Sequence, residues 1–397
     1  MPENETVRLP GAPAEDASGP ALLRLARSSR AAGRRALQRL SVGQQAEACR
    51  ELRPEVRSEF LMLCDYPEQV VPLLPEAEVA ISIRASGMSE AAWLLEIASP
   101  EQRVACTDVD CWDGWTLDRG RVVEWVDALI EAGRPTLLKA LREWDPELWL
   151  LALGGMADVA VVGKEEDPPD GWMTQDGVVY WGAHSDEDFA RVREIAQASF
   201  AEDTARYWQL VYGLLFEQPP ELEEYALKWH TARMGDLGFP DLEQAMEIYR
   251  PLSAESAPLL DVPEEDEEAA VVPAAPLPRQ LGGTLLAEAL EGLRGDRAAE
   301  VLGYVLGVAN CVAVADGLRL SESESIPAAT EKAVRGIDLG LRELAAARAM
   351  PVQDVLDRTR PADLFRIGVT LDDTLRRPPA SERGEDAEAG VDESDES

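Results

Sequence analysis

Histidine is scarce in this chain, which has only His184 and His230 among its 397 residues. Catalytic triads, metalloprotease motifs and most general acid–base schemes depend on histidine, so this scarcity excludes most of them. We expect both histidines to be surface or packing residues. The sequence also has no Gly-x-Gly-x-x-Gly after a predicted strand and no Gly-x-x-x-x-Gly-Lys-Ser/Thr loop. Since these loops hold nucleotide phosphates, we predict no bound nucleotide cofactor.

Basic residues are also in short supply, with 38 Lys and Arg against 75 Asp and Glu, a formal net charge of -37. A strongly negative field opposes binding to nucleic acids and anionic lipids. No apolar run approaches the roughly 20 residues of a membrane span, because the longest candidate, 148–162, contains Gly154, Gly155 and Asp158. We therefore predict neither a nucleic-acid partner nor a membrane span.

The cysteine count and the composition of the first 20 residues predict the cellular compartment of the protein. The five cysteines are an odd number, and residues 1–20 contain prolines and acids where a secretory leader has an apolar core. Both features favour a reducing cytoplasm.

One segment reverses the charge balance, because residues 21–40 contain six arginines and no acid: Arg24, Arg27, Arg30, Arg34, Arg35 and Arg39. This basic helix either contacts RNA, a membrane surface or an acidic partner, or folds against the protein's own negative surface. The overall charge favours the internal alternative.

Pro-Glu pairs recur at residues 54–55, 67–68, 75–76, 100–101 and 146–147, and apolar helical stretches follow most of them. Proline is tolerated in the first helical turn, and glutamate there meets the positive end of the helix dipole. Repeated helix starts with similar apolar faces predict an α-solenoid, in which each unit buries its apolar side against its neighbours. The predicted fold class is therefore mostly α.

The helical pattern is interrupted once. Residues 173–175 and 178–181 flank Asp176 and Gly177, a pair typical of tight hairpin turns, which predicts a small β-hairpin near 172–182. Six prolines between 251 and 280, and six acids between 261 and 268, predict a linker before a helical bundle. The predicted organisation is a disordered lead-in (1–20), a superhelical domain (21–250), an acidic Pro-rich linker (251–280), a C-terminal helical domain (281–377) and an acidic disordered tail (378–397).

Three stretches resemble an uncharacterised bacterial family of unknown function: Arg233-Met-Gly-Asp-Leu-Gly-Phe-Pro-Asp-Leu-Glu-Gln-Ala-Met-Glu-Ile-Tyr249, Asp108-Val-Asp-Cys-Trp112 and Val314-Ala-Asp-Gly-Leu318. The resemblance covers residues 21–377 and implies an architecture without a known activity. Separately, residues 37–153 resemble the cytosolic N-terminal superhelical domain of bacterial magnesium channels. The chain lacks the membrane domain of such channels, so this second resemblance implies no transport.

Three carboxylates, Asp108, Asp110 and Asp113, lie within six residues. Converging carboxylates are ligands for Mg²⁺ or Mn²⁺. The spacing lacks the glycine and final glutamate of an EF-hand, and aspartates between helices more commonly cap helices or form turns. A magnesium site here is the alternative to that structural role. Cys106 and Cys111 have no second pair nearby, which argues against zinc.

Ten tryptophans lie between Trp93 and Trp229. Most should be buried, but Trp112, Trp115, Trp172 and Trp181 fall in or beside predicted loops, where aromatics either anchor protein partners or pack beside the core. In a separate stretch, Arg233, Asp236 and Asp241 form either a polar binding site or a capped corner held by a buried Arg–Asp pair.

These features favour a cytoplasmic scaffold or adaptor that binds a protein through its solenoid face, since such surfaces need no catalytic apparatus. We do not expect an enzyme. The alternative is a divalent-cation-dependent enzyme or sensor that uses Asp108, Asp110 and Asp113.

Overall fold

The computed structural model describes residues 18–163, 167–260, 281–293 and 295–378. Within these residues the protein is mostly α-helical, as the sequence predicts, with one two-stranded and one three-stranded antiparallel sheet. The expected tail and the acidic part of the expected linker lie outside the described residues, as does most of the lead-in.

Short helices make up the N-terminal half, and every Pro-Glu pair begins one, although the pair at Pro54 begins a single 3₁₀ turn (Pro54–Val56). The helices are α1 (Gly19–Ser28), α2 (Arg30–Leu37), α3 (Val42–Arg50), α4 (Arg57–Leu61), α5 (Pro67–Val70), α6 (Glu76–Ser86), α7 (Met88–Ala91), α8 (Trp93–Ile97), α9 (Pro100–Asp110), α10 (Arg119–Glu131), α11 (Arg134–Glu143) and α12 (Pro146–Met156). A further 3₁₀ turn spans Val71–Leu73. Ser99 and Gln102 form a capping box at the start of α9, which satisfies the free N–H groups there.

The predicted basic helix is two helices, α1 and α2. Two of its six arginines pair with acids of the same chain: Arg27 lies 2.6 Å from Glu59, and Arg34 lies 2.6 Å from Asp65. These contacts agree with the expectation that the basic segment meets the protein's own acidic surface.

A three-stranded sheet follows α12, with strands β3 (Ala157–Val161), β4 (Met173–Thr174) and β5 (Val179–Ala183) in the order β3-β5-β4. The predicted hairpin is its β4–β5 part, in which Met173 pairs with Trp181 and Thr174 with Tyr180. Gly177 has φ of 74°, a conformation that glycine adopts without strain, so the Asp-Gly signal identified the turn correctly.

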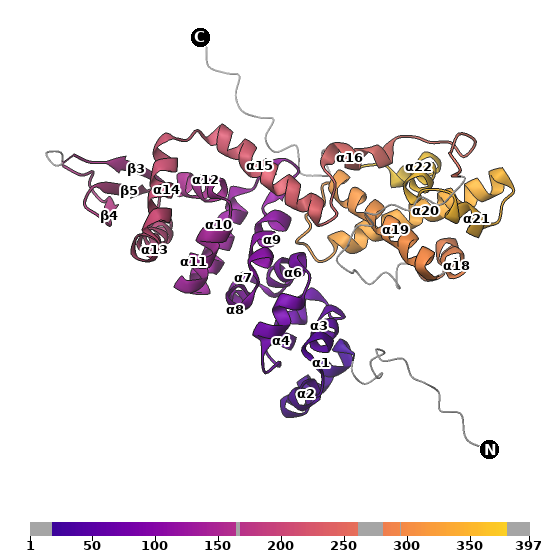
Figure 1. The fold of residues 1–397 in the computed structure, drawn as a ribbon, viewed down its shortest axis with the longest axis horizontal. Helices are drawn as coiled ribbons and strands as arrows, with labels where there is room; N and C mark the ends of the chain where they lie inside the picture. The colour runs from indigo at the N-terminus through magenta and orange to yellow at the C-terminus, as the bar shows by residue number, and fades with distance from the viewer. Residues whose placement is uncertain (1–17, 164–166, 261–280, 294, 379–397) are drawn as a thin grey trace, which may run out of the picture.

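Longer helices α13 (Asp186–Glu202), α14 (Thr204–Phe216) and α15 (Pro219–Asp236) come next, followed by α16 (Leu242–Met246) and a 3₁₀ turn (Glu247–Tyr249). α12 packs on both α14 and α15. In Figure 1, α15 runs from the sheet side of the molecule toward the C-terminal helices.

The C-terminal region contains α18 (Leu285–Glu291), α19 (Gly295–Ala315), α20 (Ser325–Arg348), α21 (Val352–Asp357), α22 (Pro361–Leu371) and a 3₁₀ turn (Asp373–Leu375). α19 packs against α16, α20 and α22. Part of it, residues 297–315, is long and apolar enough to cross a membrane by length and composition, with a mean hydropathy of 1.7. In the structure, 44% of this apolar stretch is buried.

Residues 251–260 differ from a free linker, because they pack on the C-terminal helices. Ala254 and Ala257 are buried, and Arg348 donates hydrogen bonds to the carbonyl oxygens of both residues. The Leu260 N–H donates to the Arg358 carbonyl oxygen at 2.8 Å.

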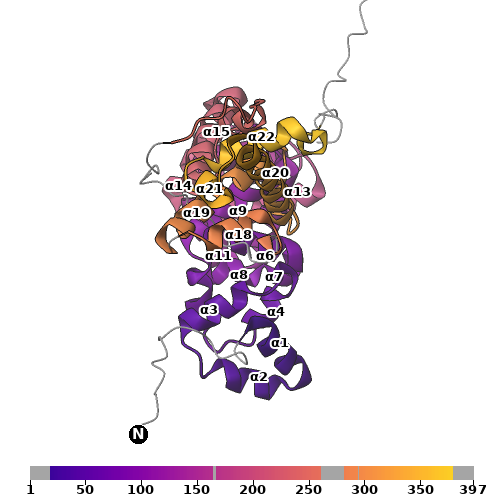
Figure 2. The ribbon, with the colours of Figure 1, turned by 90° about the vertical axis from the view of Figure 1, so that its right-hand side faces the viewer.

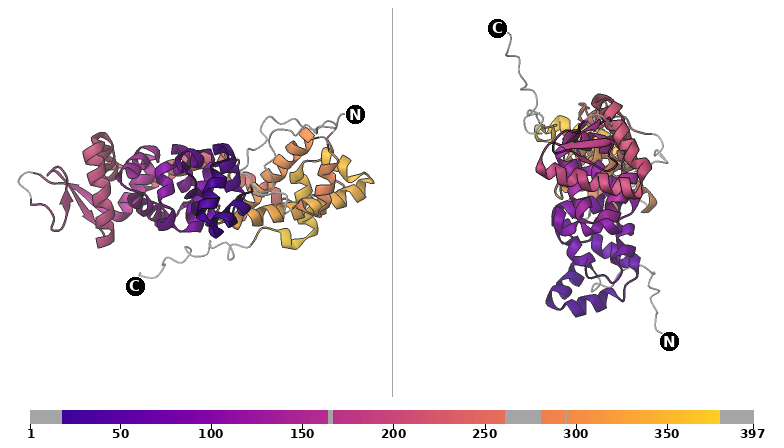
Figure 3. Two further views of the ribbon diagram at one scale, coloured as in Figure 1. Left: turned by 90° about the horizontal axis from the view of Figure 1, so that it is seen from below. Right: turned by 90° about the vertical axis from the view of Figure 1, so that its left-hand side faces the viewer.

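Three arms meet near α9 and α15 (Figure 1): the sheet with α13 and α14, the C-terminal helices, and α1 to α4. Turning the view by 90° shows α1 to α4 extending away from the rest (Figure 2). From below, the sheet and the C-terminal helices occupy opposite ends of the long axis (Figure 3).

Candidate functional site

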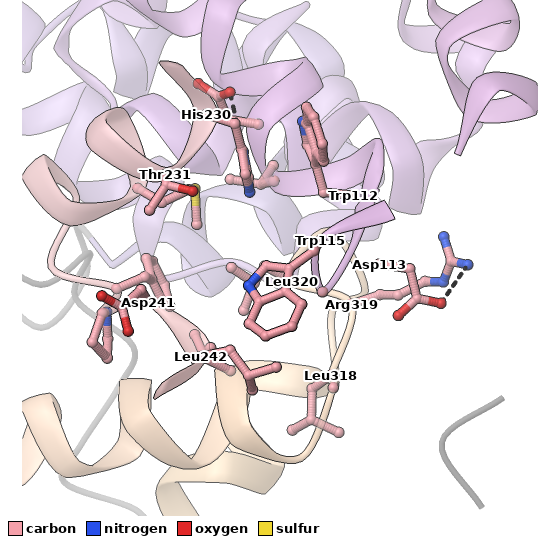
Figure 4. A pocket seen from close by; sticks show the side chains of 18 residues that line it. Trp112, Asp113, Trp115, His230, Thr231, Asp241, Leu242, Leu318, Arg319 and Leu320 are labelled. Atoms are coloured by element: carbon pink, nitrogen blue, oxygen red, sulfur yellow. Dashed lines mark hydrogen bonds and ion pairs between the residues drawn. The ribbon is translucent and has the colours of Figure 1, made fainter. Parts of the chain in front are cut away.

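A pocket lies where three distant parts of the chain meet. Its walls come from residues 108–115 at the end of α9, residues 230–242 between α15 and α16, and residues 314–320 after α19. The cavity has a volume of about 90 Å³ (Figure 4). All three stretches that carry the family resemblance contribute to it, although they lie up to 200 residues apart in the sequence.

A β-hairpin forms one wall and was not predicted. Strands β1 (Trp112–Asp113) and β2 (Thr116–Leu117) pair with Trp112 opposite Leu117. Gly114 has φ of 58°, so the turn depends on a residue without a side chain. The Asp113-Gly114 pair was the available signal, since the same dipeptide identified the other hairpin. The turn presents Trp115, which is 62% exposed.

Asp108 joins two helices at the back of the pocket. Its carboxylate, 2% exposed, accepts two hydrogen bonds from Arg233 of α15, at 2.6 and 2.9 Å. Arg233 also donates to Asp145, just before α12, at 2.8 and 3.1 Å. Burial alone would lower the pKa of Arg233, but its hydrogen bonds to the two carboxylates and their charges raise that pKa above its ordinary value. Arg233 is therefore held by the buried Asp108 and by Asp145. Within the described residues it forms no ion pair with Asp236 or Asp241, the two acids considered for the predicted corner.

His230 is fixed between Asp108 and Trp112. Its Nδ1 lies 3.3 Å from Asp108 Oδ1, and its ring stacks on Trp112 with centroids 4.5 Å apart. The residue is only 9% exposed. In Figure 4 the ring nitrogen that Asp108 does not hold points toward Trp115. His230 is thus a packed residue, as expected, but it also presents one nitrogen to the pocket.

Asp110 serves a different cluster behind the pocket. Its fully buried carboxylate pairs with Arg84 and accepts hydrogen bonds from Arg121 and Trp125, both at 2.7 Å. It also accepts a hydrogen bond from Ser321, which lies in the C-terminal region. Asp110 therefore connects α6, α10 and the segment after α19.

Asp113 faces a third direction, with a carboxylate oxygen 3.7 Å from Arg319. The structure therefore does not bring Asp108, Asp110 and Asp113 to one point. Among the described residues, no group of three His, Cys, Asp or Glu side chains is placed to hold a metal ion. Metal binding here stays a prediction from the sequence, and the observed partners are arginines.

Cys106 and Cys111 lie next to Asp110 and are both fully buried free thiols. Burial raises the pKa of each thiol, and the charge of Asp110 raises both further. Since the thiolate is the reactive form, neither cysteine has the surroundings of a nucleophile.

Asp241 and Asp236 lie on either side of the turn between α15 and α16 and differ in role. Asp241 lines the pocket and caps α16, where its Oδ1 accepts a hydrogen bond from the Gln244 N–H at 2.8 Å. Asp236 is exposed and does not line the pocket. Of the predicted partner-binding residues, Trp112 and Trp115 line this pocket, and Arg233 supports it from behind.

The other two predicted anchors lie in the three-stranded sheet. Trp181 is 1% exposed and donates a hydrogen bond to the Tyr207 hydroxyl at 3.3 Å, so the prediction that it faces a partner is wrong. Trp172 covers Gly182, where a Cβ would lie 2.2 Å from its ring. Trp172 comes just before β4. β5, which carries Trp181, packs on α13, and β3 packs on both α13 and α14.

Sequence reasoning also missed exposed aromatics on α14 and α15. Tyr212 and Phe216 are 56% and 72% exposed and stack at 6.2 Å. Tyr225 and Trp229 are 54% and 47% exposed. Their i, i+4 spacing was visible, but the same spacing describes a buried stripe.

Comparison with protein families matches residues 34–381 to a family described as a family of unknown function, DUF6178. No curated protein and no solved structure gives a significant match. The resemblance of residues 37–153 to the magnesium-channel domain therefore stays a prediction. Because the matched segment spans most of the chain and includes all three walls of the pocket, the chain belongs to this family of unknown function.

Proposed function

We propose that this protein is a cytoplasmic scaffold or adaptor that binds a protein partner at the pocket formed by the end of α9, the α15–α16 turn and the segment after α19. The observation that carries this proposal is Trp115, which is 62% exposed at the pocket. Tryptophan is enriched among the residues that dominate interface energies, because it buries a large apolar area with little loss of side-chain entropy.

The support around Trp115 is rigid, which lowers the cost of binding. The tight β1–β2 hairpin fixes its backbone, and the neighbouring Trp112 stacks on His230. A preorganised anchor loses less entropy when a partner covers it. An exposed indole on a fixed turn is therefore suited to recognition.

Affinity capture from the native host, with full-length protein as bait, tests this proposal. Trp115→Ala should lower the yield of at least one captured protein by about tenfold or more, as for an interface hot spot. Phe216→Ala is the matched control, since Phe216 is an exposed aromatic on α14 that does not line the pocket. An identical set of captured proteins for wild type and Trp115→Ala contradicts the proposal.

The alternative of a divalent-cation-dependent enzyme or sensor has no specific observation in its favour here. It predicts saturable heat on titration with Mg²⁺ or Mn²⁺ that Asp110→Asn abolishes. A titration without heat for either ion contradicts that alternative.

A further inference from the structure

The pocket contains one carboxylate that lacks a basic partner. Asp108 is paired with Arg233, and Asp113 lies near Arg319. Asp241, by contrast, forms no ion pair within the residues that the structure describes. Its Oδ1 is used to cap α16, and its other oxygen has no hydrogen-bond partner in the same described part of the chain. The lining therefore carries one uncompensated negative charge.

A second acceptor faces the same space. The carboxylate of Asp108 already accepts N–H groups from Arg233, so it acts as the acceptor toward His230 as well. In the neutral ring, Nδ1 of His230 then carries the proton and Nε2 keeps a lone pair. Nε2 has no partner among the described residues, and Figure 4 shows this nitrogen pointing into the pocket. Nε2 is open to the pocket, where a ligand donor can replace water as its hydrogen-bond partner.

An aromatic side chain completes the site, since Trp115 lines the same pocket as His230 and Asp241 (Figure 4). The face of an indole ring attracts a cation. The pocket thus offers Nε2 of His230 and the uncompensated carboxylate of Asp241 as two acceptors, beside the indole ring of Trp115. Together they suit a group that is positively charged and rich in N–H donors.

We infer that the pocket binds a basic side chain, arginine or lysine, of the partner protein, with Nε2 of His230 and the free oxygen of Asp241 as acceptors and Trp115 as the aromatic wall. This inference rests on the proposed function and specifies what the partner presents. The net charge of -37 supports it, because a strongly negative protein attracts a basic partner at long range. A cavity of about 90 Å³ suits the end of one side chain.

The test uses full-length protein and three probes in a ligand-observed NMR titration. The probes are the tripeptide amide Ac-Gly-Arg-Gly-NH₂, its neutral isostere with citrulline in place of arginine, and agmatine, a free small guanidinium. The arginine peptide should bind saturably and about tenfold more tightly than the citrulline peptide, with an affinity that falls as salt is added. Agmatine should bind more weakly than the arginine peptide.

Variants identify the contacting groups. Asp241→Asn removes the charge but keeps the helix cap, since asparagine caps helices as well as aspartate does. Asp241→Asn should lower the affinity for the arginine peptide about fivefold or more. Trp115→Ala should have a similar effect, and so should His230→Phe, a substitution that keeps an aromatic ring against Trp112. Asp236→Asn is the matched control, because it removes an equal charge outside the pocket and should change nothing.

Equal binding of the arginine and citrulline peptides overturns the inference, as does an Asp241→Asn variant with wild-type affinity. Agmatine binding as tightly as the peptide assigns the pocket to a free small cation and overturns it too. The two proposals fail separately. Loss of a captured partner in Trp115→Ala without probe binding contradicts only this inference, whereas probe binding without any loss of a partner contradicts only the scaffold proposal.

Discussion

Helices from distant parts of the chain meet in two places: the pocket lined by residues 108–115, 230–242 and 314–320, called the junction here, and the bundle formed by α18 to α22. The kinds of residue that hold the helices together differ between the two places. At the junction the contacts are charged: Asp108 holds Arg233, which lies 125 residues away, and Asp110 holds Arg84 and Arg121. In the bundle, α20 and α22 touch backbone to backbone. A Cβ on Gly340 would lie 1.8 Å from the Leu364 carbonyl oxygen, and one on Gly368 would lie 2.1 Å from that of Gly336.

The two contacts differ in burial. The bundle helices meet at buried glycines, Gly336, Gly340 and Gly368, which let the two backbones approach closely. The junction borders an open pocket, where arginine stems can pack inward while their head groups neutralise buried carboxylates. The junction is thus specified by charge pairs, and the bundle by the absence of side chains.

The largest expected effect is at Asp110. Asp110→Ala leaves Arg84 and Arg121 without the fully buried carboxylate that they share, and removal of one partner from a buried pair costs about 3 to 5 kcal/mol. Urea unfolding of the full chain measures this loss. Asp113→Ala is the matched control, because its side chain is 37% exposed and its ion pair is longer, and it should change stability little. Equal losses for both variants would contradict the charge-pair account.

Gly340→Ala tests the bundle. Its new methyl group meets backbone rather than a flexible side chain, so α20 and α22 must separate, at a cost of about 3 kcal/mol. Gly307→Ala, on α19, adds a methyl group with nothing within 4 Å, and should be neutral or slightly stabilising because alanine favours helix. The same denaturation experiment separates the two, and an unchanged midpoint for Gly340→Ala would exclude the close helix contact.

The smallest effect is expected at Glu76, at the start of α6. Burial, followed by the charges of Glu101, Asp108 and Asp236, raises its pKa above 4.5. The folded state then binds this proton more tightly than the unfolded state, so the carboxyl destabilises the fold only as pH rises through its raised pKa. Glu76→Gln should raise the Tm near pH 7 by about 1 °C and lose that advantage as pH falls toward 4.5.

Glu68→Gln controls for the helix dipole, because Glu68 follows Pro67 at the start of α5 and is exposed. A pH-independent gain shared by both variants would attribute the effect to helix starts rather than to the acids around Glu76.

Much of the helical array was predictable because its signals are local. Pro-Glu pairs and capping residues act within one turn, and all five pairs begin helical segments. The hairpin at Asp176 was equally local, whereas the one at Gly114 was missed because helix signals surround it. Gly340 could not be interpreted from the sequence, since nothing near it indicates a backbone 24 residues away.

The candidate site was predictable only in its parts. Asp108, Trp115 and Arg233 were singled out individually. The spacing of Asp108, Asp110 and Asp113 suggested helix caps or, as the alternative, a metal site, and gave no indication that Arg233 neutralises Asp108. His230 was set aside as a packing residue because histidine is scarce, although its free nitrogen faces the pocket. Pairings between residues more than 100 positions apart depend on tertiary packing, which local patterns do not encode.

The central claim is that three distant segments form one site, and hydrogen exchange of the full chain tests it most directly. Asp110→Ala removes the acceptor for Ser321, so amides of residues 314–321 should exchange faster although the substitution lies in α9. Amides at the centre of α20 should be accelerated less than those of residues 314–321, because only the loss of global stability reaches them. Faster exchange confined to the helices around Asp110, with residues 314–321 unchanged, would contradict the claim that the two regions build the pocket together.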